Sequence, residues 1–333
     1  MNVLALTFGD ETCASSLYRI FQYREELLRH DIQLEIVTAN EFAAWDGLGR
    51  YDVVILQKRL FGGGIVKRLR AGARRLVYDI DDAIWLPHDR PHHWLTRWRT
   101  DRRLKAIAKA ADVCLAANDL LRRKLAEVGG NARVLPMSLD DQEWIYKEDI
   151  PKRLRVGWIG SPPNLPYLEA IETELTQVQA AHPDLEFCVN CGVAPKLSNG
   201  LRYTHIPYRP GTEAENVRSF DIGLLPLPDN PFAAGKSPIK ALQYMASGAV
   251  PIASPIGATC EMFRPGKEGL HALEPGDWFH AISQLAEDRE LLAGMKQAAR
   301  QRFQEHYSLS RNADQLARLL KSLGGPADGR SES

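Results

Sequence analysis

The chain contains two successive series of short runs rich in valine, isoleucine and leucine, separated by stretches with helical periodicity. The first series covers residues 2–8, 33–39, 51–57, 74–80, 111–117 and 132–138, and the second covers 154–160, 185–190, 202–208, 220–227 and 249–254. Continuous apolar runs between helices are typical of parallel sheets that are covered by helices on both faces. The sequence therefore predicts an α/β protein with two Rossmann-like domains.

Length and loss of periodicity suggest the domain boundaries. A chain of 333 residues suits two domains of ordinary size. We expect an N-terminal domain over residues 1–140, a charged linker over 141–152, a C-terminal domain over 153–322 and a disordered tail over 323–333. Two open parallel sheets bind ligands at the carboxyl ends of their strands, so we expect the site in a cleft between the domains.

Composition argues against several classes of protein. The 42 basic and 42 acidic side chains cancel, and no run of eighteen apolar residues occurs, so we expect neither a nucleic-acid partner nor a membrane span. Met1 leads directly into an apolar strand pattern without the features of a signal peptide, which predicts a cytoplasmic protein. The five cysteines form no even disulfide framework and are interpreted as free thiols.

Positive charge is nevertheless concentrated in one part of the chain. Residues 58–125 contain seventeen Lys and Arg against seven Asp, and the stretch "WLTRWRTDRRLKAIAKA" interleaves Trp94 and Trp98 with arginines. Such a face could contact an anionic membrane, which would give the protein a peripheral position at the inner membrane face. An ordinary solvated helix face is the alternative, and the sequence favours it.

The segment Gly235-Lys236-Ser237 resembles the end of a P-loop but lacks its context. A P-loop needs a further glycine five positions before Gly235, where this chain has Asn230. Ser237 followed by Pro238 instead predicts a capped helix over 237–247. The start of this helix beside Lys236 would bind a phosphate group, and the alternative is an ordinary cap with a solvated lysine.

Three aspartates, Asp79, Asp81 and Asp82, stand at the end of the fourth apolar run. They could form a metal site, supply the nucleophile of a Mg²⁺-dependent phosphatase through Asp79 and Asp81, place one carboxylate against a substrate hydroxyl, or form a turn. The later loops of this half are poor in acids, which argues against the metal and phosphatase interpretations.

The turn "GWIGSPPN" has two glycines, but prolines interrupt the fingerprint that a dinucleotide such as NAD requires. Gly160 and Ser161 would let the backbone approach a diphosphate closely, or they form a plain tight turn. The loop after the first apolar run, which contains Ser15 and Ser16, would face the same cleft.

With both halves considered, the sequence resembles the GT-B glycosyltransferases of the large retaining family usually called family 4. The resemblance runs from the first strand to about residue 322. It rests on "YDIDDAIW", "RVLPMSLD", "RVGWIGSP", "FDIGLLPL", "GKSPIKALQYMASGAVPIASPIGATCEMF" and "EGLHAL", of which the stretch 219–262 is the specific part. It implies a GT-B fold, a nucleotide-sugar donor held mainly by the C-terminal domain, an acceptor held mainly by the N-terminal domain, and no metal or other cofactor.

The donor motif of that family is two glutamates separated by seven residues, and both are replaced in this chain. The second glutamate aligns with Gln243, whose amide can still reach ribose hydroxyls, and the first aligns with Gly235. The backbone after the first glutamate cradles the diphosphate in the family, which implies this role for Lys236 and Ser237. Basic residues that the family often has after the strand of "GWIG" are missing, so Lys236 would supply that charge.

The resemblance also implies roles in the N-terminal half, where the acceptor-side histidine of the family aligns best with Asp81. We therefore expect Asp81 to be catalytic and Ser15, Ser16 and Asp82 to contact the acceptor. Donor contacts are expected from Gly160, Ser161, Lys236, Ser237 and Gln243.

The resulting hypothesis is a metal-independent, retaining transferase that moves a sugar from a nucleotide-sugar donor to a hydroxyl of a glycan or small-molecule acceptor. Three alternatives stay open at this point. They are a GT-B-like epimerase, a Mg²⁺-dependent phosphatase that uses Asp79 and Asp81, and a catalytically inactive nucleotide-binding homologue that acts as a partner protein, as the two missing glutamates suggest.

Overall fold

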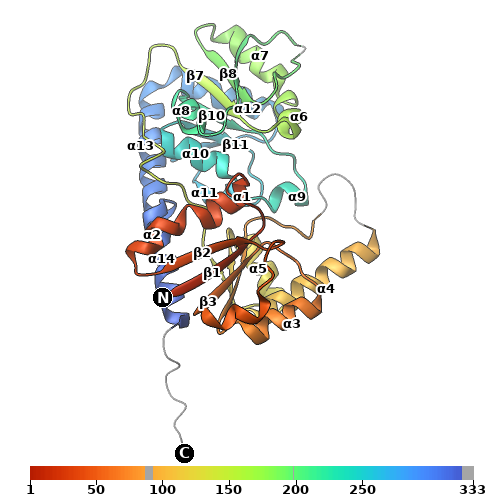
Figure 1. The fold of residues 1–333 in the computed structure, drawn as a ribbon. Coiled ribbons are helices and arrows are strands. Elements are labelled where there is room, and N and C mark those ends of the chain that lie inside the picture. The colour runs from red at the N-terminus through yellow and green to blue at the C-terminus, as the bar shows by residue number, and fades with distance from the viewer. Residues whose placement is uncertain (87–92, 198, 325–333) are drawn as a thin grey trace, which may run out of the picture. The chain divides into compact units, whose positions relative to one another are not determined.

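The computed structural model describes residues 1–86, 93–197 and 199–324, and the chain divides into two compact units. Unit 1 contains Met1–Ser138, Gly235–Ser237 and the chain from Leu309 onward, and unit 2 contains Leu139–Ala234 and Pro238–Ser308. Each unit has a six-stranded sheet whose paired strands are parallel (Figure 1). The predicted pair of Rossmann-like domains is confirmed.

The sheet of unit 1 has the strand order β2-β1-β3-β4-β5-β6. Its strands are β1 (Asn2–Thr7), β2 (Gln33–Thr38), β3 (Val53–Gln57), β4 (Leu76–Ile80), β5 (Val113–Ala116) and β6 (Ala132–Val134). Its helical segments are α1 (Ala14–Ser16), the π-helical η1 (Leu17–Phe21), α2 (Tyr23–Arg29), the 3-10 segment η2 (Trp45–Arg50), α3 (Gly63–Gly72), α4 (Trp94–Ala110), α5 (Asp119–Glu127) and α14 (Leu309–Gly324). None of the helices within the described residues is long and apolar enough to cross a bilayer.

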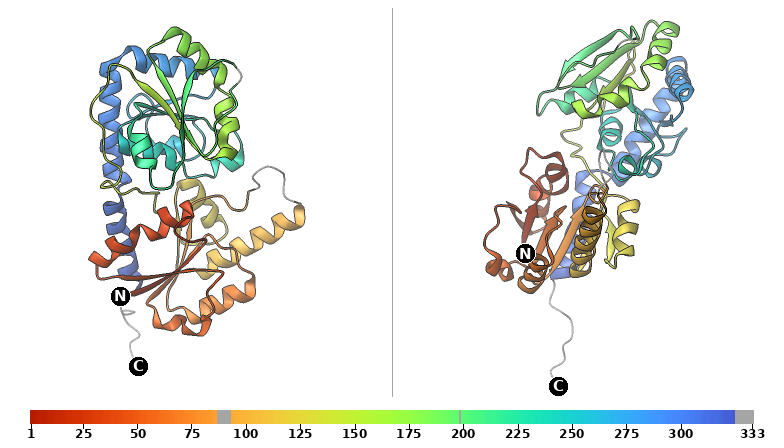
Figure 2. Two further views of the ribbon diagram at one scale, coloured as in Figure 1. Left: turned by 45° about the horizontal axis from the view of Figure 1, so that its top comes forward. Right: turned by 90° about the vertical axis from the view of Figure 1, so that its right-hand side faces the viewer.

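Helices cover both faces of this sheet (Figure 2). On one face, α2 and α14 pack against alternating strand residues such as Val3, Ile55 and Val77. On the other face lie α3, α4 and α5. Burial on both faces is the reason that these strands are continuously apolar rather than alternating.

The last helix differs from the predicted domain division, which assigned residues 153–322 to a single C-terminal domain. In the structure α14 belongs to unit 1, where Leu309, Leu316 and Leu320 complete the core beside β1 and β3. The apolar stripe of a helix shows that it packs, but it does not show against which sheet. Residues 325–333 of the predicted tail lie outside the described residues.

The sheet of unit 2 has the strand order β12-β11-β10-β7-β8-β9. Its strands are β7 (Arg155–Ile159), β8 (Glu186–Cys191), β9 (Tyr203–Pro207), β10 (Ile222–Leu225), β11 (Val250–Ala253) and β12 (Leu270–His271). Its helical segments are η3 (Pro162–Asn164), α6 (Leu165–Glu169), α7 (Glu172–Ala181), α8 (Glu213–Arg218), α9 (Pro231–Ala234), α10 (Ile239–Ser247), α11 (Thr259–Met262), α12 (Pro275–Glu287) and α13 (Arg289–His306).

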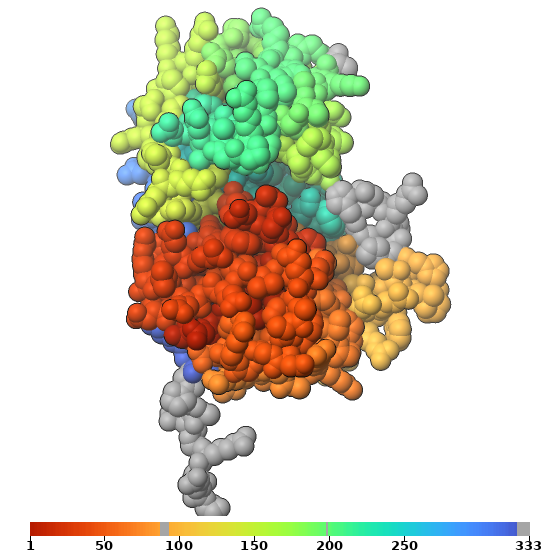
Figure 3. Space-filling model, viewed as in Figure 1, coloured from red at the N-terminus to blue at the C-terminus, as the bar shows by residue number. Residues whose placement is uncertain are grey.

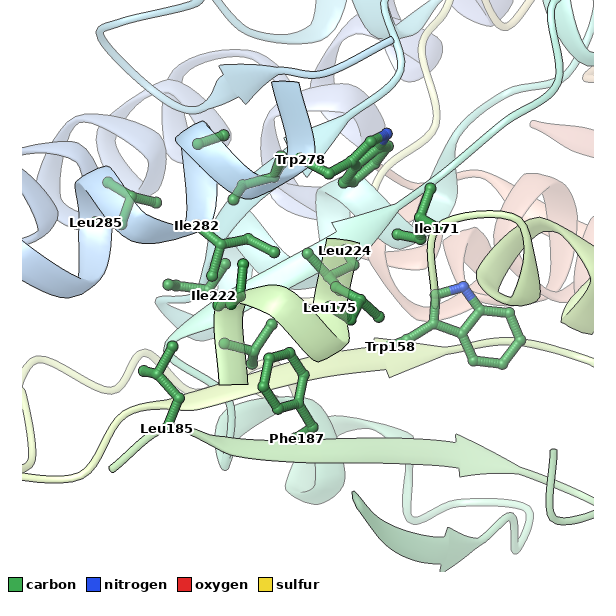
Figure 4. Close-up of a cluster of buried hydrophobic side chains, with 14 of the residues drawn as sticks. Trp158, Ile171, Leu175, Leu185, Phe187, Ile222, Leu224, Trp278, Ile282 and Leu285 are labelled. Atoms are coloured by element: carbon green, nitrogen blue, oxygen red, sulfur yellow. The ribbon is translucent and has the colours of Figure 1, made fainter. Parts of the chain in front are cut away.

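The core of unit 2 lies between the sheet and the helices α6, α7 and α12 (Figure 4). On the opposite face, α10 packs so closely on β10 that a Cβ at Gly223 would lie 2.3 Å from Cγ of Tyr244. The hydroxyl of Tyr244 donates to the Leu224 carbonyl at 3.0 Å and accepts the Ile159 amide at 3.2 Å. These contacts fix α10 against the carboxyl ends of two strands.

The predicted linker over residues 141–152 is a packed part of unit 2. Trp144 is buried, and the ammonium of Lys147 lies 2.8 Å from Oδ1 of the buried Asp221. The ammonium of Lys296 donates to the Asp149 carbonyl at 2.9 Å. The sequence pattern of a linker and that of an irregular but packed segment are the same, because neither has periodicity.

Truncation of the side chain in Leu320→Ala should destabilise unit 1 by about 2 to 5 kcal/mol, because Leu320 is fully buried in its core. Hydrogen exchange should show faster opening of β1 and β3, with β7 and β8 unchanged. The exposed neighbour provides the control, and Arg318→Ala should leave both sheets unchanged. Selective loosening of β7 and β8 would instead assign α14 to unit 2.

Candidate functional site

Polar side chains collect at the carboxyl end of the unit 1 sheet. Lys58 follows β3, Asp81 and Asp82 follow β4, Asn118 follows β5, and Ser15 lies in α1. Parallel strands bring residues that are distant in sequence to the same edge of the sheet, where open α/β folds bind ligands.

Asp81 is held from two sides. Its side chain is 6% exposed, its Oδ2 accepts the Ser15 hydroxyl at 2.6 Å, and its Oδ1 lies 3.1 Å from the ammonium of Lys58. The same ammonium lies 2.5 Å from Oδ2 of Asp82, whose side chain is 39% exposed. The predicted proximity of Ser15, Asp81 and Asp82 therefore exists, with Asp82 as the more accessible carboxylate.

Lys58 joins the two carboxylates, and sequence reasoning missed it. Its backbone is left-handed with φ of 58°, a conformation that costs a non-glycine residue energy and that often occurs at functional sites. Burial lowers the pKa of Lys58, but the charges of Asp81 and Asp82 outweigh this effect and raise it overall. Its position directly after a buried strand was the signal that could have identified it.

The segment Gly235–Ser237 belongs to unit 1 and extends this cluster. The Ser237 hydroxyl donates to the Asp81 carbonyl at 2.6 Å and lies 3.3 Å from Nδ2 of Asn118, while the Ala83 amide donates to the Gly235 carbonyl at 3.0 Å. The same segment contains Lys236, a second cation whose charge acts on Asp82.

Burial is the largest cause of the pKa shifts of Asp82 and Lys236. Burial and the charge of Asp81 raise the pKa of Asp82, while Lys58 and Lys236 oppose the shift. Burial lowers the pKa of Lys236, and the charge of Asp82 opposes that effect. Lys236 and Asp82 are therefore close enough to influence each other electrostatically. The sequence predicted a phosphate site at Lys236 but not this interaction with a carboxylate.

The prediction that Ser237 caps the following helix is wrong. The helix α10 begins at Ile239 with Pro238 in the N-cap position, and no side chain caps it. Ser237 instead hydrogen bonds to residues from the ends of β4 and β5. The Ser237 hydroxyl hydrogen bonds to these distant residues rather than to the amides of the helix start. A Ser-Pro pair in the sequence does not show that such distant partners are present.

Asp79 has a structural role that argues against the phosphatase interpretation. It forms a buried bidentate ion pair with Arg19 from η1, which also donates to the carbonyls of Leu135 and Pro136. Burial raises the pKa of Asp79, and Arg19 opposes this shift. Within the described residues no group of three or more His, Cys, Asp or Glu side chains could hold a metal ion.

Ser16, which we expected to contact the acceptor, is fully buried. Its hydroxyl donates to Oε1 of Gln57 at 3.1 Å and accepts the Gly9 amide at 3.0 Å. The expectation rested on the position of Ser16 in a loop after β1, but the residue ends the short helix α1 and faces the interior. Ser15, one residue earlier, is the serine that reaches Asp81.

The predicted donor contacts of unit 2 are distributed over two elements. Gly160 follows β7, its amide donates to the Asn190 carbonyl at 3.1 Å, and a Cβ there would lie 2.3 Å from the Trp158 ring. The glycine is therefore required by packing within the unit. Ser161 is exposed, and Gln243 is buried in α10.

Comparison with known proteins shows the fold of the chain and a family likeness over one part of it. Residues 198–318 match a family model described as glycosyl transferase-like, and no curated protein matches. Among solved structures, the sucrose-phosphate synthase of Thermosynechococcus elongatus is 15% identical over 97% of this chain and 98% of its own, with a TM-score of 0.75. The chain therefore has the GT-B fold and carries a glycosyltransferase-like domain.

Two further solved structures share this fold. HepE of Anabaena, in complex with UDP and glucose, is 15% identical over 97% of this chain and all 100% of its own, with a TM-score of 0.68. A glycosyltransferase from Rickettsia africae is 13% identical over 98% of this chain and 99% of its own, with a TM-score of 0.67.

Replacement of the shared cation in Lys58→Met should raise the pKa of Asp82 further, because an opposing positive charge is lost. Ionisation of a carboxyl with a raised pKa weakens stability as pH rises through that pKa. The variant should therefore be less stable than the wild type near neutral pH and recover part of the difference in acid. Carbon NMR titration of Asp82 and unfolding at several pH values test this.

The matched control for this experiment is Arg59→Met, which removes the adjacent cation. Arg59 donates to the Phe8 carbonyl at 3.1 Å and packs 4.6 Å from the Phe8 ring, so its loss should leave the titration of Asp82 unchanged. An unaltered Asp82 midpoint in Lys58→Met would show that Lys58 does not control these carboxylates.

Proposed function

We propose that the protein transfers a sugar from a nucleotide-sugar donor to a hydroxyl of a glycan or small-molecule acceptor, with retention of configuration and without a metal ion. The glycosyl transferase-like match over residues 198–318 carries this proposal, because it includes Lys236, Ser237 and Gln243. The solved complexes of HepE with UDP and with UDP-glucose favour a donor of the same class.

In the proposed reaction the acceptor oxygen forms a bond to the anomeric carbon of the donor sugar. The bond from that carbon to the diphosphate breaks, and its electron pair stays on the diphosphate oxygen. The hydroxyl proton is lost, so the products are the glycoside, a nucleoside diphosphate and one proton. Groups that orient the hydroxyl and stabilise charge on the diphosphate accelerate such a transfer.

On the acceptor side, Asp81 polarises the attacking hydroxyl, and Asp82 and Ser15 position it. Each oxygen of an ionised carboxylate has two lone pairs, so the bonds from Ser15 and Lys58 leave acceptor capacity at Asp81. Lys58 favours the ionised form of Asp82, because its positive charge opposes the rise in the pKa of that carboxyl. We assign no acceptor contact to Ser16, since its hydroxyl is used inside the unit.

On the donor side, Lys236 and the backbone around Ser237 bind the diphosphate, and Gln243 binds the ribose. Gly160 has no side chain and so leaves room for the diphosphate to approach the backbone. Its amide does not bind the diphosphate, because it already donates to the Asn190 carbonyl. Ser161, which is exposed next to it, is free to turn its hydroxyl toward a phosphate after releasing Nδ2 of Asn164.

A catalytically inactive nucleotide-binding homologue is the second candidate. It is favoured by Gly235 and Gln243, which occupy the positions of two glutamates in the family that the chain resembles. Such a protein would be stabilised by nucleoside diphosphates but would not turn over any nucleotide sugar. A thermal-shift screen combined with a turnover assay distinguishes the two candidates.

Lys236→Ala should weaken binding of nucleoside diphosphates by about tenfold to a hundredfold, the range expected for one charge-assisted hydrogen bond. Binding of free nucleosides should change little, because they lack the diphosphate. Calorimetric titration measures both affinities. The exposed loop lysine Lys267 supplies the control, and Lys267→Ala should bind as the wild type does. Equal diphosphate affinity in all three proteins would remove Lys236 from the donor site.

Asp81→Asn should lower the rate of sugar transfer by on the order of a hundredfold or more, because an amide polarises a hydroxyl poorly. The affinity for nucleoside diphosphate should be retained, which separates this effect from loss of the donor site. Transfer is measured with labelled UDP-, GDP- and ADP-sugars, in parallel with and without EDTA. Full transfer by Asp81→Asn at all acceptor concentrations would contradict the assignment, and loss of wild-type activity in EDTA would contradict metal independence.

A further inference from the structure

The amino-terminal half of α4, residues 94–103, exposes large apolar side chains. Trp94 is 67% exposed, Trp98 is 56% exposed and Leu95 is 42% exposed. Every residue from His93 to Arg99 is exposed, so the first turns of the helix have no buried face. Clustered tryptophans on an unburied helix are unusual for a surface that only faces water.

The carboxyl-terminal half of α4 anchors the helix to unit 1. Leu104, Ile107 and Ala108 are buried, and the helix contacts α3, α5 and β4. Figure 1 shows the amino-terminal half reaching beyond the sheet of its own unit, and in Figure 3 this part of the chain projects at the side of the unit. The exposed tryptophans are therefore carried on a rigid element rather than on a loop.

The exposed apolar face is distinct from the packed one. With about 100° per residue, Trp94, Leu95 and Trp98 fall on one side of the helix, and the buried Leu104 and Ile107 fall more than about 90° away from its centre. The three exposed residues do not continue the stripe that packs on unit 1. They form a second apolar face, which we call the tryptophan face of α4.

Positive charge surrounds the tryptophan face. Arg97 and Arg99 flank it on either side, and the guanidinium of Arg102 lies 5.4 Å from the ring centroid of Trp98. The whole helix has six basic residues and one acidic residue, although the full chain has a net charge of zero. Within the described part of the chain, Arg97, Arg99 and Arg103 form no ion pair with a carboxylate.

We propose that the tryptophan face of α4 binds the surface of an anionic lipid bilayer. Indole and leucine side chains enter the headgroup region, where their amphipathic or apolar character is accommodated. The flanking arginines contact lipid phosphates, and each adds about fivefold to the affinity near an anionic surface. This binding positions the protein peripherally at an anionic membrane surface.

Charge and shape favour lipid over other partners. A nucleic-acid binder usually carries an excess of positive charge, whereas the 42 basic and 42 acidic residues of this chain cancel. The first turns of α4 are exposed on all sides, so one side of them can enter a membrane interface without opening unit 1. The proposal does not rest on the sugar-transfer reaction, and either can fail without the other.

Co-sedimentation of the full chain tests the proposal, with vesicles of phosphatidylcholine alone and vesicles that also contain phosphatidylglycerol. We expect binding only to the anionic vesicles, weakening as salt rises, with a blue shift of tryptophan emission and quenching by brominated lipid. The double variant Trp94→Ser/Trp98→Ser should bind at least about tenfold more weakly and lose the quenching, because both side chains provide the interfacial contact. The variant Arg97→Ser/Arg99→Ser should lose most of the dependence on anionic lipid.

Matched controls remove equally exposed residues elsewhere. Leu28 is 59% exposed and Ile145 is 54% exposed, so Leu28→Ser/Ile145→Ser serves as the apolar control, and Arg24→Ser/Arg311→Ser as the basic control. Circular dichroism confirms that each variant folds. The proposal is overturned if wild type fails to bind anionic vesicles at low salt, if the controls lose as much affinity as the α4 variants, or if an oligonucleotide competes away all vesicle binding.

Discussion

The buried ion pair between Arg19 and Asp79 organises the carboxyl end of the unit 1 sheet. Arg19 lies in the π-helical segment after β1, and it joins the carboxylate of Asp79 on β4 to the carbonyls that follow β6. A buried charge without its partner is very costly, so each group requires the other. The pair thereby connects three chain segments at the edge of the sheet where Asp81 and Asp82 emerge.

Next to this buried pair lies the polar cluster of Lys58, Asp81, Asp82 and Lys236, which contains the partly exposed carboxylate of Asp82. The ammonium of Lys58 lies 3.1 Å from Asp81 and 2.5 Å from Asp82, and the charge of Lys236 also acts on Asp82, the more exposed of the two carboxylates. Such an arrangement keeps the carboxylates available for hydroxyl groups without leaving a charge unpaired. The left-handed backbone of Lys58 is consistent with a site whose geometry is imposed by the surrounding sheet.

The structure changes the interpretation of the basic helix α4. In the sequence, the interleaved tryptophans and arginines favoured a solvated helix face. In the structure the tryptophans point away from the packed stripe, and only the second half of the helix is anchored. A solvated face would not need two exposed indoles, whereas a surface that contacts a membrane interface would.

By itself, the sequence determined the two parallel sheets, the approximate positions of their strands and the position of Asp81 and Asp82 directly after β4. These features depend on local periodicity and on the rule that strand ends collect functional side chains. Only the tertiary structure decided that α14 completes unit 1, that Ser16 is internal, that Lys58 joins the carboxylates and that Ser237 binds the Asp81 carbonyl. Each of these depends on which distant segments meet. The sequence of an apolar helix or of a serine near a loop does not depend on which distant segment it contacts. Such contacts are therefore set by the packing of the whole unit and not by the local sequence pattern.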